Sequence, residues 1–150
     1  METYTIRQVS ELFGLPASTL RYYEEMGILT NVEKNASGHR VYSSGHINRL
    51  RTISCFKRTG MSIAQLQKFF GFEADEPNRI GDILALLEEQ ERHVADQIAE
   101  LQQDQTHVRR KLCYYRAIQT ALQQGTALPH WGDYRDCSAQ DLTPENDPSK

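Results

Sequence analysis

The sequence has few cysteines and no long apolar run, and each absence excludes a class of protein. No stretch approaches the roughly 18–20 apolar residues that a membrane span needs. The N-terminus METYTIRQVSELFG also lacks the basic-then-apolar pattern of a signal peptide. We therefore expect a cytoplasmic protein with no membrane partner, whose three cysteines are reduced rather than paired in disulfides.

Clusters of catalytic side chains are also missing. The five histidines are scattered along the chain. No nucleophile stands at a catalytic spacing from a base, and there is no phosphate-binding loop or pair of neighbouring carboxylates typical of an active site. We expect a protein that is not an enzyme and that needs no cofactor.

Acidic residues are absent from one long stretch near the N-terminus. Between Lys34 and Lys68 the chain has seven basic residues and no acidic one. The first 72 residues hold nine Lys and Arg against five Asp and Glu, although the whole chain has a net charge of −3. Such a basic region suits a polyanionic partner, because every phosphate that it neutralises releases a counterion.

Short helices separated by glycines are predicted for this basic region. Thr5 and Gln8 have the T-x-x-Q spacing of a capping box, and Gly14 suits the end of the helix that they open. A second helix follows in PASTLRYYEEMG, residues 16–27. Two short helices joined by a tight glycine turn indicate a helix-turn-helix, with the second as the recognition helix.

An extended segment and two more helices complete the region. Residues 28–42 have β-branched residues on both sides of the turn-forming stretch NASG, which predicts a hairpin, or wing. Helices are then predicted over residues 44–60 and 62–71. The second of them opens with another capping box, formed by Ser62 and Gln65.

Proline and glycine are absent between Gly81 and Gly125, and apolar residues recur there every seven positions. This row contains Ile80, Leu87, Val94, Leu101, Val108, Tyr115 and Leu122. A second row, offset by four positions, alternates apolar Leu84, Ile98 and Leu112 with polar Glu91, Gln105 and Gln119. The pattern predicts one helix over residues 80–124, about 65 Å long at about 1.5 Å per residue. Its partner is most simply a second copy of the chain, although packing onto its own head is the alternative.

Two segments flank this helix. Residues 73–79 are polar and contain a proline, so we expect a linker there. Residues 125–150 are mostly polar and hold three of the five prolines, which predicts a flexible tail.

Three ordered motifs carry a resemblance to a known family. TLRYYEEMGIL (19–29), SGHRVY (37–42) and KRTGMSIAQLQKF (57–69), followed by the long helix, resemble the MerR family of bacterial transcription regulators. The similarity extends from residue 4 to about residue 124. It implies a mainly α fold: a winged helix-turn-helix head over residues 1–72, then a dimerisation helix that forms an antiparallel coiled coil.

The resemblance also implies a function. Members of the family are homodimers that bind a palindromic promoter whose spacer is too long for RNA polymerase, and they activate by distorting it. The polymerase is therefore a partner only indirectly, through the promoter. The positions implied to contact DNA are Thr19, Arg21 and Tyr22 in the recognition helix, Lys34, His39 and Arg40 in the wing, and Lys57 at the end of the third helix. At His39, many members have tyrosine.

Cys55 is the candidate for receiving a signal. It lies off the stripe of Ile47, Leu50, Ile53 and Ser54 on the third helix. The arginines at positions 51 and 58 favour the thiolate, which is the nucleophilic form. A free cysteine is commonly a small buried hydrophobe instead, and this alternative stays open. The surrounding ISCFKRTGM (53–61) resembles the aldehyde- and electrophile-responsive NmlR/AdhR subgroup, which implies sensing through this thiol.

Two other hypotheses remain at this point. Cys113, His130 and Cys137 could converge on a soft metal ion, which would make the protein a metal-responsive regulator. No closely spaced cysteine pair supports that ligand set. Alternatively, the protein is a coiled-coil adaptor whose basic head binds something other than DNA.

Overall fold

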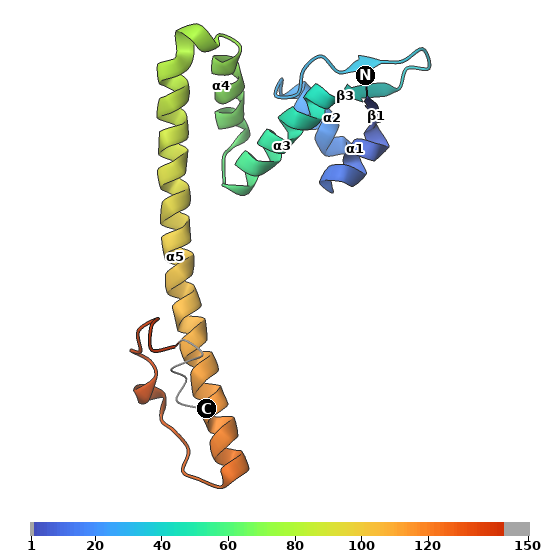
Figure 1. The fold of residues 1–150 in the computed structure, drawn as a ribbon. Helices are drawn as coiled ribbons and strands as arrows, with labels where there is room; N and C mark the ends of the chain where they lie inside the picture. Colours follow the sequence, from blue (N-terminus) through green and yellow to red (C-terminus); the bar gives the residue numbers. More distant parts are fainter. Residues whose placement is uncertain (1, 143–150) are drawn as a thin grey trace. The chain divides into compact units, whose positions relative to one another are not determined.

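The computed structural model describes residues 2–142 and shows a mainly helical chain with one small sheet, as the sequence predicts (Figure 1). In chain order the elements are β1 (Thr3–Thr5), α1 (Ile6–Phe13), α2 (Ala17–Glu25), β2 (Glu33–Lys34), β3 (Arg40–Ser43), α3 (Ser44–Arg58), α4 (Ile63–Glu73), α5 (Glu76–Gln124) and the 3-10 helix η1 (Trp131–Asp133). The chain forms two compact units, one ending at Arg92 and the other beginning at His93, and α5 contributes to both. No helix within residues 2–142 is long and apolar enough to cross a membrane.

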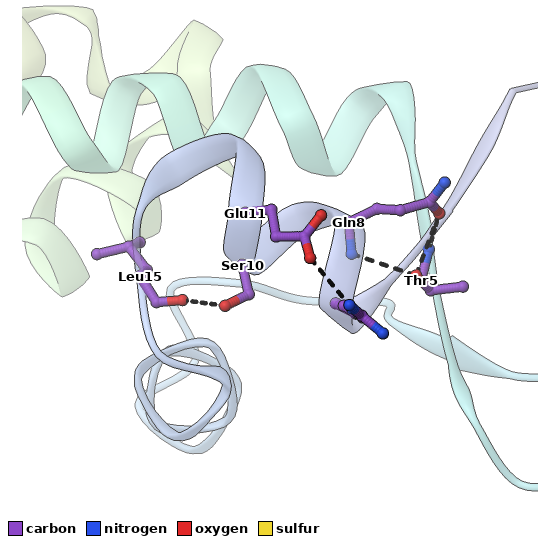
Figure 2. A network of polar contacts seen from close by, with 6 residues as sticks. Thr5, Gln8, Ser10, Glu11 and Leu15 are labelled. Carbon is purple, nitrogen blue, oxygen red and sulfur yellow. Dashed lines mark hydrogen bonds and ion pairs between the residues drawn. The ribbon is translucent and has the colours of Figure 1, made fainter.

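The predicted helix-turn-helix consists of α1 and α2. The Thr5 hydroxyl accepts the Gln8 backbone N–H at 3.2 Å, and the Gln8 side chain accepts the Thr5 N–H at 2.8 Å (Figure 2). At the other end of α1, Gly14 has φ 63°, a left-handed conformation that favours glycine. The Ser10 carbonyl accepts the N–H groups of Gly14 and Leu15, and the Ser10 hydroxyl donates to the Leu15 carbonyl. Local hydrogen bonds therefore set the turn between the two helices.

The predicted wing is the hairpin of β2 and β3. Its turn is held by Asn35, whose side-chain oxygen accepts the N–H groups of Ser37 and His39, both at 3.0 Å. The strand β1, which the sequence analysis did not predict, pairs antiparallel with β3 on its other side, so the sheet order is β1-β3-β2. Three residues are too few to show an alternation of apolar and polar side chains, so the strand is identified only by its pairing with β3, in which Tyr4 lies opposite Tyr42.

The helices α3 and α4 open at capping boxes. Ser62 and Gln65 form the predicted one, and Ser43 pairs with His46 in one that the sequence analysis missed. The predicted end of α4 at Gly71 is wrong, because the helix continues to Glu73. A helical glycine disfavours the helix by only about 1 kcal/mol, which the burial of neighbouring aromatic side chains offsets.

The long helix starts one turn earlier than predicted. We expected a linker over residues 73–79 and a helix from Ile80, whereas α5 begins at Glu76 and only Ala74 and Asp75 separate it from α4. Pro77 does not interrupt the helix because it lies in the first turn, where no N–H is needed for a helical hydrogen bond.

The core of the first unit draws on every helix of the head. Its fully buried large side chains are Val9, Leu20, Ile28, Leu29, Tyr42, Leu50, Ile53, Met61 and Leu66. Ile83, Leu86 and Leu87 pack against this core, so the first turns of α5 complete the head.

The second unit contains a smaller core between α5 and the tail. Cys113, Tyr134 and Leu142 are buried, with Trp131 and Cys137 packed against them. The tail is thus folded against α5 through Leu142, although we expected it to be flexible; residues 143–150 lie outside the described part. Its polar composition concealed a few large apolar side chains that reach one face of the helix.

Candidate DNA-binding surface and thiol site

The recognition helix α2 directs two of its predicted contact residues outward. Leu20 and Tyr23 are buried, and they anchor one side of the helix. Arg21 and Tyr22 are exposed, with 42% of Tyr22 accessible, while Thr19 is half-buried. This arrangement leaves a guanidinium and a phenol hydroxyl available for phosphate or base contacts.

The wing carries the next group of predicted residues. Lys34 and His39 are exposed on either side of the hairpin turn. Arg40 differs, because it forms an ion pair with Glu24 of α2. Its Nε donates to both carboxylate oxygens, at 2.9 and 3.2 Å, and only 28% and 20% of the two side chains are exposed.

Glu24 therefore belongs to the site, although the sequence analysis did not select it. The Tyr42 hydroxyl also donates to its carboxylate, at 3.4 Å. Burial and the neighbouring Glu24 charge raise the pKa of Tyr42 to about 12, while Arg40 and Arg21 act in the opposite direction. Arg40 is therefore paired with this carboxylate where the recognition helix meets the wing, and Arg21 lies near enough to Tyr42 to oppose the rise in its pKa.

The end of α3 supplies further cations. Lys57, predicted to contact DNA, is exposed, and so are Arg51 and Arg58. Arg49 is held inside the head, since its Nε donates to the Ile28 carbonyl at 2.6 Å. Burial lowers the pKa of the Arg49 guanidinium. Of the seven basic residues between positions 34 and 68, all except Arg40 and Arg49 are exposed to solvent.

Cys55 lies on the exposed side of α3, so the alternative of a buried small hydrophobe is wrong. Its backbone is part of a connection to α5. The Cys55 carbonyl accepts the Thr59 N–H at 3.2 Å, and the Thr59 hydroxyl donates to the Phe56 carbonyl at 2.7 Å. The Gln90 amide in turn donates to the Thr59 hydroxyl at 2.9 Å and to its carbonyl at 3.1 Å. The segment that carries the thiol is thereby attached to the long helix.

The other two cysteines lie in the second unit. Cys113 is buried, and Cys137 is half-buried and donates to the Asp133 carbonyl at 3.3 Å. Cys137 packs against the cluster that contains Cys113, whereas His130 is exposed. Within residues 2–142 no three His, Cys, Asp or Glu side chains are grouped closely enough to hold a metal ion. The hypothetical ligand set of Cys113, His130 and Cys137 is not assembled.

The head contains two short helices joined by a glycine turn and an adjoining hairpin, with exposed cations on the second helix and on the hairpin. These features define a DNA-binding protein of the winged helix-turn-helix class. The family model described as "MerR HTH family regulatory protein" matches residues 4–71, and that described as "MerR, DNA binding" matches residues 47–110. An uncharacterized HTH-type transcriptional regulator of Haemophilus influenzae is 33% identical over 114 residues, covering 76% of this chain and 84% of the relative. The chain belongs to the MerR family of transcription regulators.

Two further comparisons agree with this assignment. The chain is similar to the crystal structure of HiNmlR, a MerR family regulator lacking the sensor domain, bound to promoter DNA. The TM-score is 0.73 and the sequence identity 33%, and the match covers 83% of this chain and 92% of that one. AdhR of Bacillus subtilis is 41% identical over 64 residues, 43% of this chain and 46% of the relative. The protein is a transcription regulator that binds promoter DNA and is not an enzyme, so the adaptor hypothesis is wrong.

Proposed function

We propose that the protein is a homodimer that binds a palindromic promoter and activates transcription when an electrophile modifies Cys55. In each head the DNA contacts come from Thr19, Arg21, Tyr22, Lys34, His39, Arg40 and Lys57. Modification changes how the two heads sit on the duplex, and the deformation energy of the over-long spacer becomes part of the switch. RNA polymerase responds through the promoter rather than through a contact with this protein.

The support for a homodimer is the apolar row along α5. Leu101, Val108 and Leu122 have 67%, 64% and 68% of their surface exposed, which is far above what a finished core allows. We call this row and its offset partner row the seam. The tail packs around Cys113 and Ala117, which lie on the opposite side of α5 at about 100° per residue. The tail through Leu142 therefore leaves the seam free for the antiparallel partner helix.

The support for Cys55 as the sensor is its exposure on a helix whose last turn carries the proposed DNA contact Lys57. With an aldehyde, the sulfur adds to the carbonyl carbon and the thiol proton moves to the carbonyl oxygen, which gives a hemithioacetal. The adduct lies one turn before Thr59, which the Gln90 amide bonds to α5. A disturbance there reaches both the DNA contacts and the dimerisation helix.

The test uses a reporter driven by the DNA duplex that the protein selects from a random-sequence library. Cells are exposed to formaldehyde, methylglyoxal or a nitrosothiol, and the adduct on residues 53–61 is identified by peptide mass spectrometry. We expect Cys55→Ser to bind the duplex normally and to lose the response. Cys137→Ser is the control, because it removes a half-buried thiol outside the head and should respond fully. A normal response in Cys55→Ser would exclude the thiol as the sensor.

A further inference from the structure

Glu24 is an acidic side chain placed among the proposed DNA contacts, and the proposal above gives it no role. It projects from the recognition helix, three positions after Arg21. A carboxylate close to DNA phosphates is repelled by them. On charge alone Glu24 therefore weakens DNA binding. A favourable contribution to binding would be needed to offset this repulsion.

The geometry of the ion pair indicates that function. Glu24 lies in α2 and Arg40 in β3, so the pair joins the recognition helix to the wing across 16 residues of sequence. The Glu24 carboxylate accepts from Nε, which is the guanidinium nitrogen nearest the backbone. The terminal Nη groups of Arg40 make no further hydrogen bond or ion pair within residues 2–142. An arginine held in this way keeps a planar fork of N–H groups that fits a phosphate.

We propose that Glu24 is a positioning residue for DNA binding, which orients the Arg40 guanidinium toward a phosphate and holds the wing at a fixed angle to the recognition helix. The inference rests on the proposed function, in which Arg40 contacts DNA. A long arginine side chain loses rotamer freedom when it binds, and the ion pair removes that freedom before DNA arrives. The Tyr42 hydroxyl supports the same carboxylate from the buried side of the sheet.

A matched pair of variants separates positioning from charge. Glu24→Gln and Glu25→Gln each remove one negative charge from the same turn of α2, and Glu25 is exposed. If only repulsion matters, both variants bind the selected duplex more tightly. Under positioning, Glu24→Gln weakens binding about tenfold, while Glu25→Gln leaves it unchanged or strengthens it. Equal strengthening by both variants, measured by fluorescence anisotropy, would overturn the inference.

A double-mutant cycle distinguishes positioning from a contribution to folding alone. We expect Glu24→Ala and Arg40→Ala each to weaken binding, and the slope of log affinity against log salt to fall by about one in each because one phosphate contact is lost. In the Arg40→Ala background, removing Glu24 should cause no further loss. Additive losses with an unchanged salt slope in Glu24→Ala would contradict positioning.

Two further outcomes keep the hypotheses separable. If Arg40→Ala alone leaves affinity unchanged, the proposed Arg40 contact fails, and the inference fails with it. If Arg40→Ala weakens binding and Glu24→Gln does not, only the inference fails. Arg40→Lys keeps the charge but lacks the fork needed to serve Glu24 and a phosphate together. We expect it to lose most of the affinity that Arg40→Ala loses, which tests the geometry with both glutamates intact.

Discussion

The head and the second unit place their apolar side chains in opposite ways. In the head, Leu20, Leu50 and Ile53 have no exposed surface, and most of the exposed positions are polar or charged. In the second unit the small core covers one side of α5, while Leu101 and Leu122 on the other side stay exposed. The head buries its core within one chain, whereas the long helix leaves its seam exposed to solvent.

The largest expected effect comes from breaking the seam. Ile98→Glu with Leu101→Glu places charges where two copies of α5 would meet, and a buried unpaired charge disfavours association by several kcal/mol. We expect a monomer by light scattering and at least a hundredfold loss of affinity for the selected duplex. Ala99→Glu, on the opposite side of the helix, should remain dimeric. A double variant that stays dimeric would show that the seam is not the interface.

A smaller effect is expected from removing one exposed cation of the head. Arg21→Ala should weaken binding by about 1–3 kcal/mol if the guanidinium bonds a base, or reduce the salt slope by about one if it bonds a phosphate. The control is Arg7→Ala, since Arg7 is also exposed but is paired with Glu11 on α1. Equal losses in the two variants would reduce the role of Arg21 to general electrostatic attraction.

The smallest effect is expected from loosening the tail without touching the seam or the head. Trp131 lies against Tyr114, with ring centroids 5.5 Å apart, and the Lys111 ammonium is 3.8 Å from its ring. In a Cys55→Ser, Cys137→Ser background, Trp131→Ala should make buried Cys113 react with iodoacetamide about tenfold faster, equivalent to ~1.4 kcal/mol of easier opening. Dimerisation should not change. Leu128→Ala is the control, because Leu128 is exposed in the same tail. An unchanged rate at Cys113 would show that Trp131 does not shield it.

Features that depend on residues close together in the sequence could be predicted, whereas features that depend on residues far apart could not. The capping boxes at Thr5 and Ser62, and the turn at Gly14, depend on neighbours within a few residues, and all three are confirmed. The wing followed from the turn chemistry around Asn35. The strand β1 could not be predicted, because three residues become a strand only when β3 lies beside them.

The candidate site divides in the same way. The exposure of Cys55 follows from its helical spacing against the buried positions, whereas Arg21 and Tyr22 were selected through the family resemblance. The pairing of Arg40 with Glu24 does not, because the two residues lie on different elements and meet only after the sheet packs against α2. In the sequence, Arg40 and Arg49 are counted with the other basic residues of the head. In the structure, Arg40 is paired with Glu24 and Arg49 donates to the Ile28 carbonyl.

The sequence by itself determined the order of helices, the wing and the seven-residue row along α5, because each is set by local hydrogen bonding or by a periodic pattern. Only the tertiary structure decided where α5 begins, that the tail through Leu142 packs on it, and that Glu24 links the recognition helix to the wing. Those features depend on contacts between residues distant in sequence, whose energies no local pattern encodes.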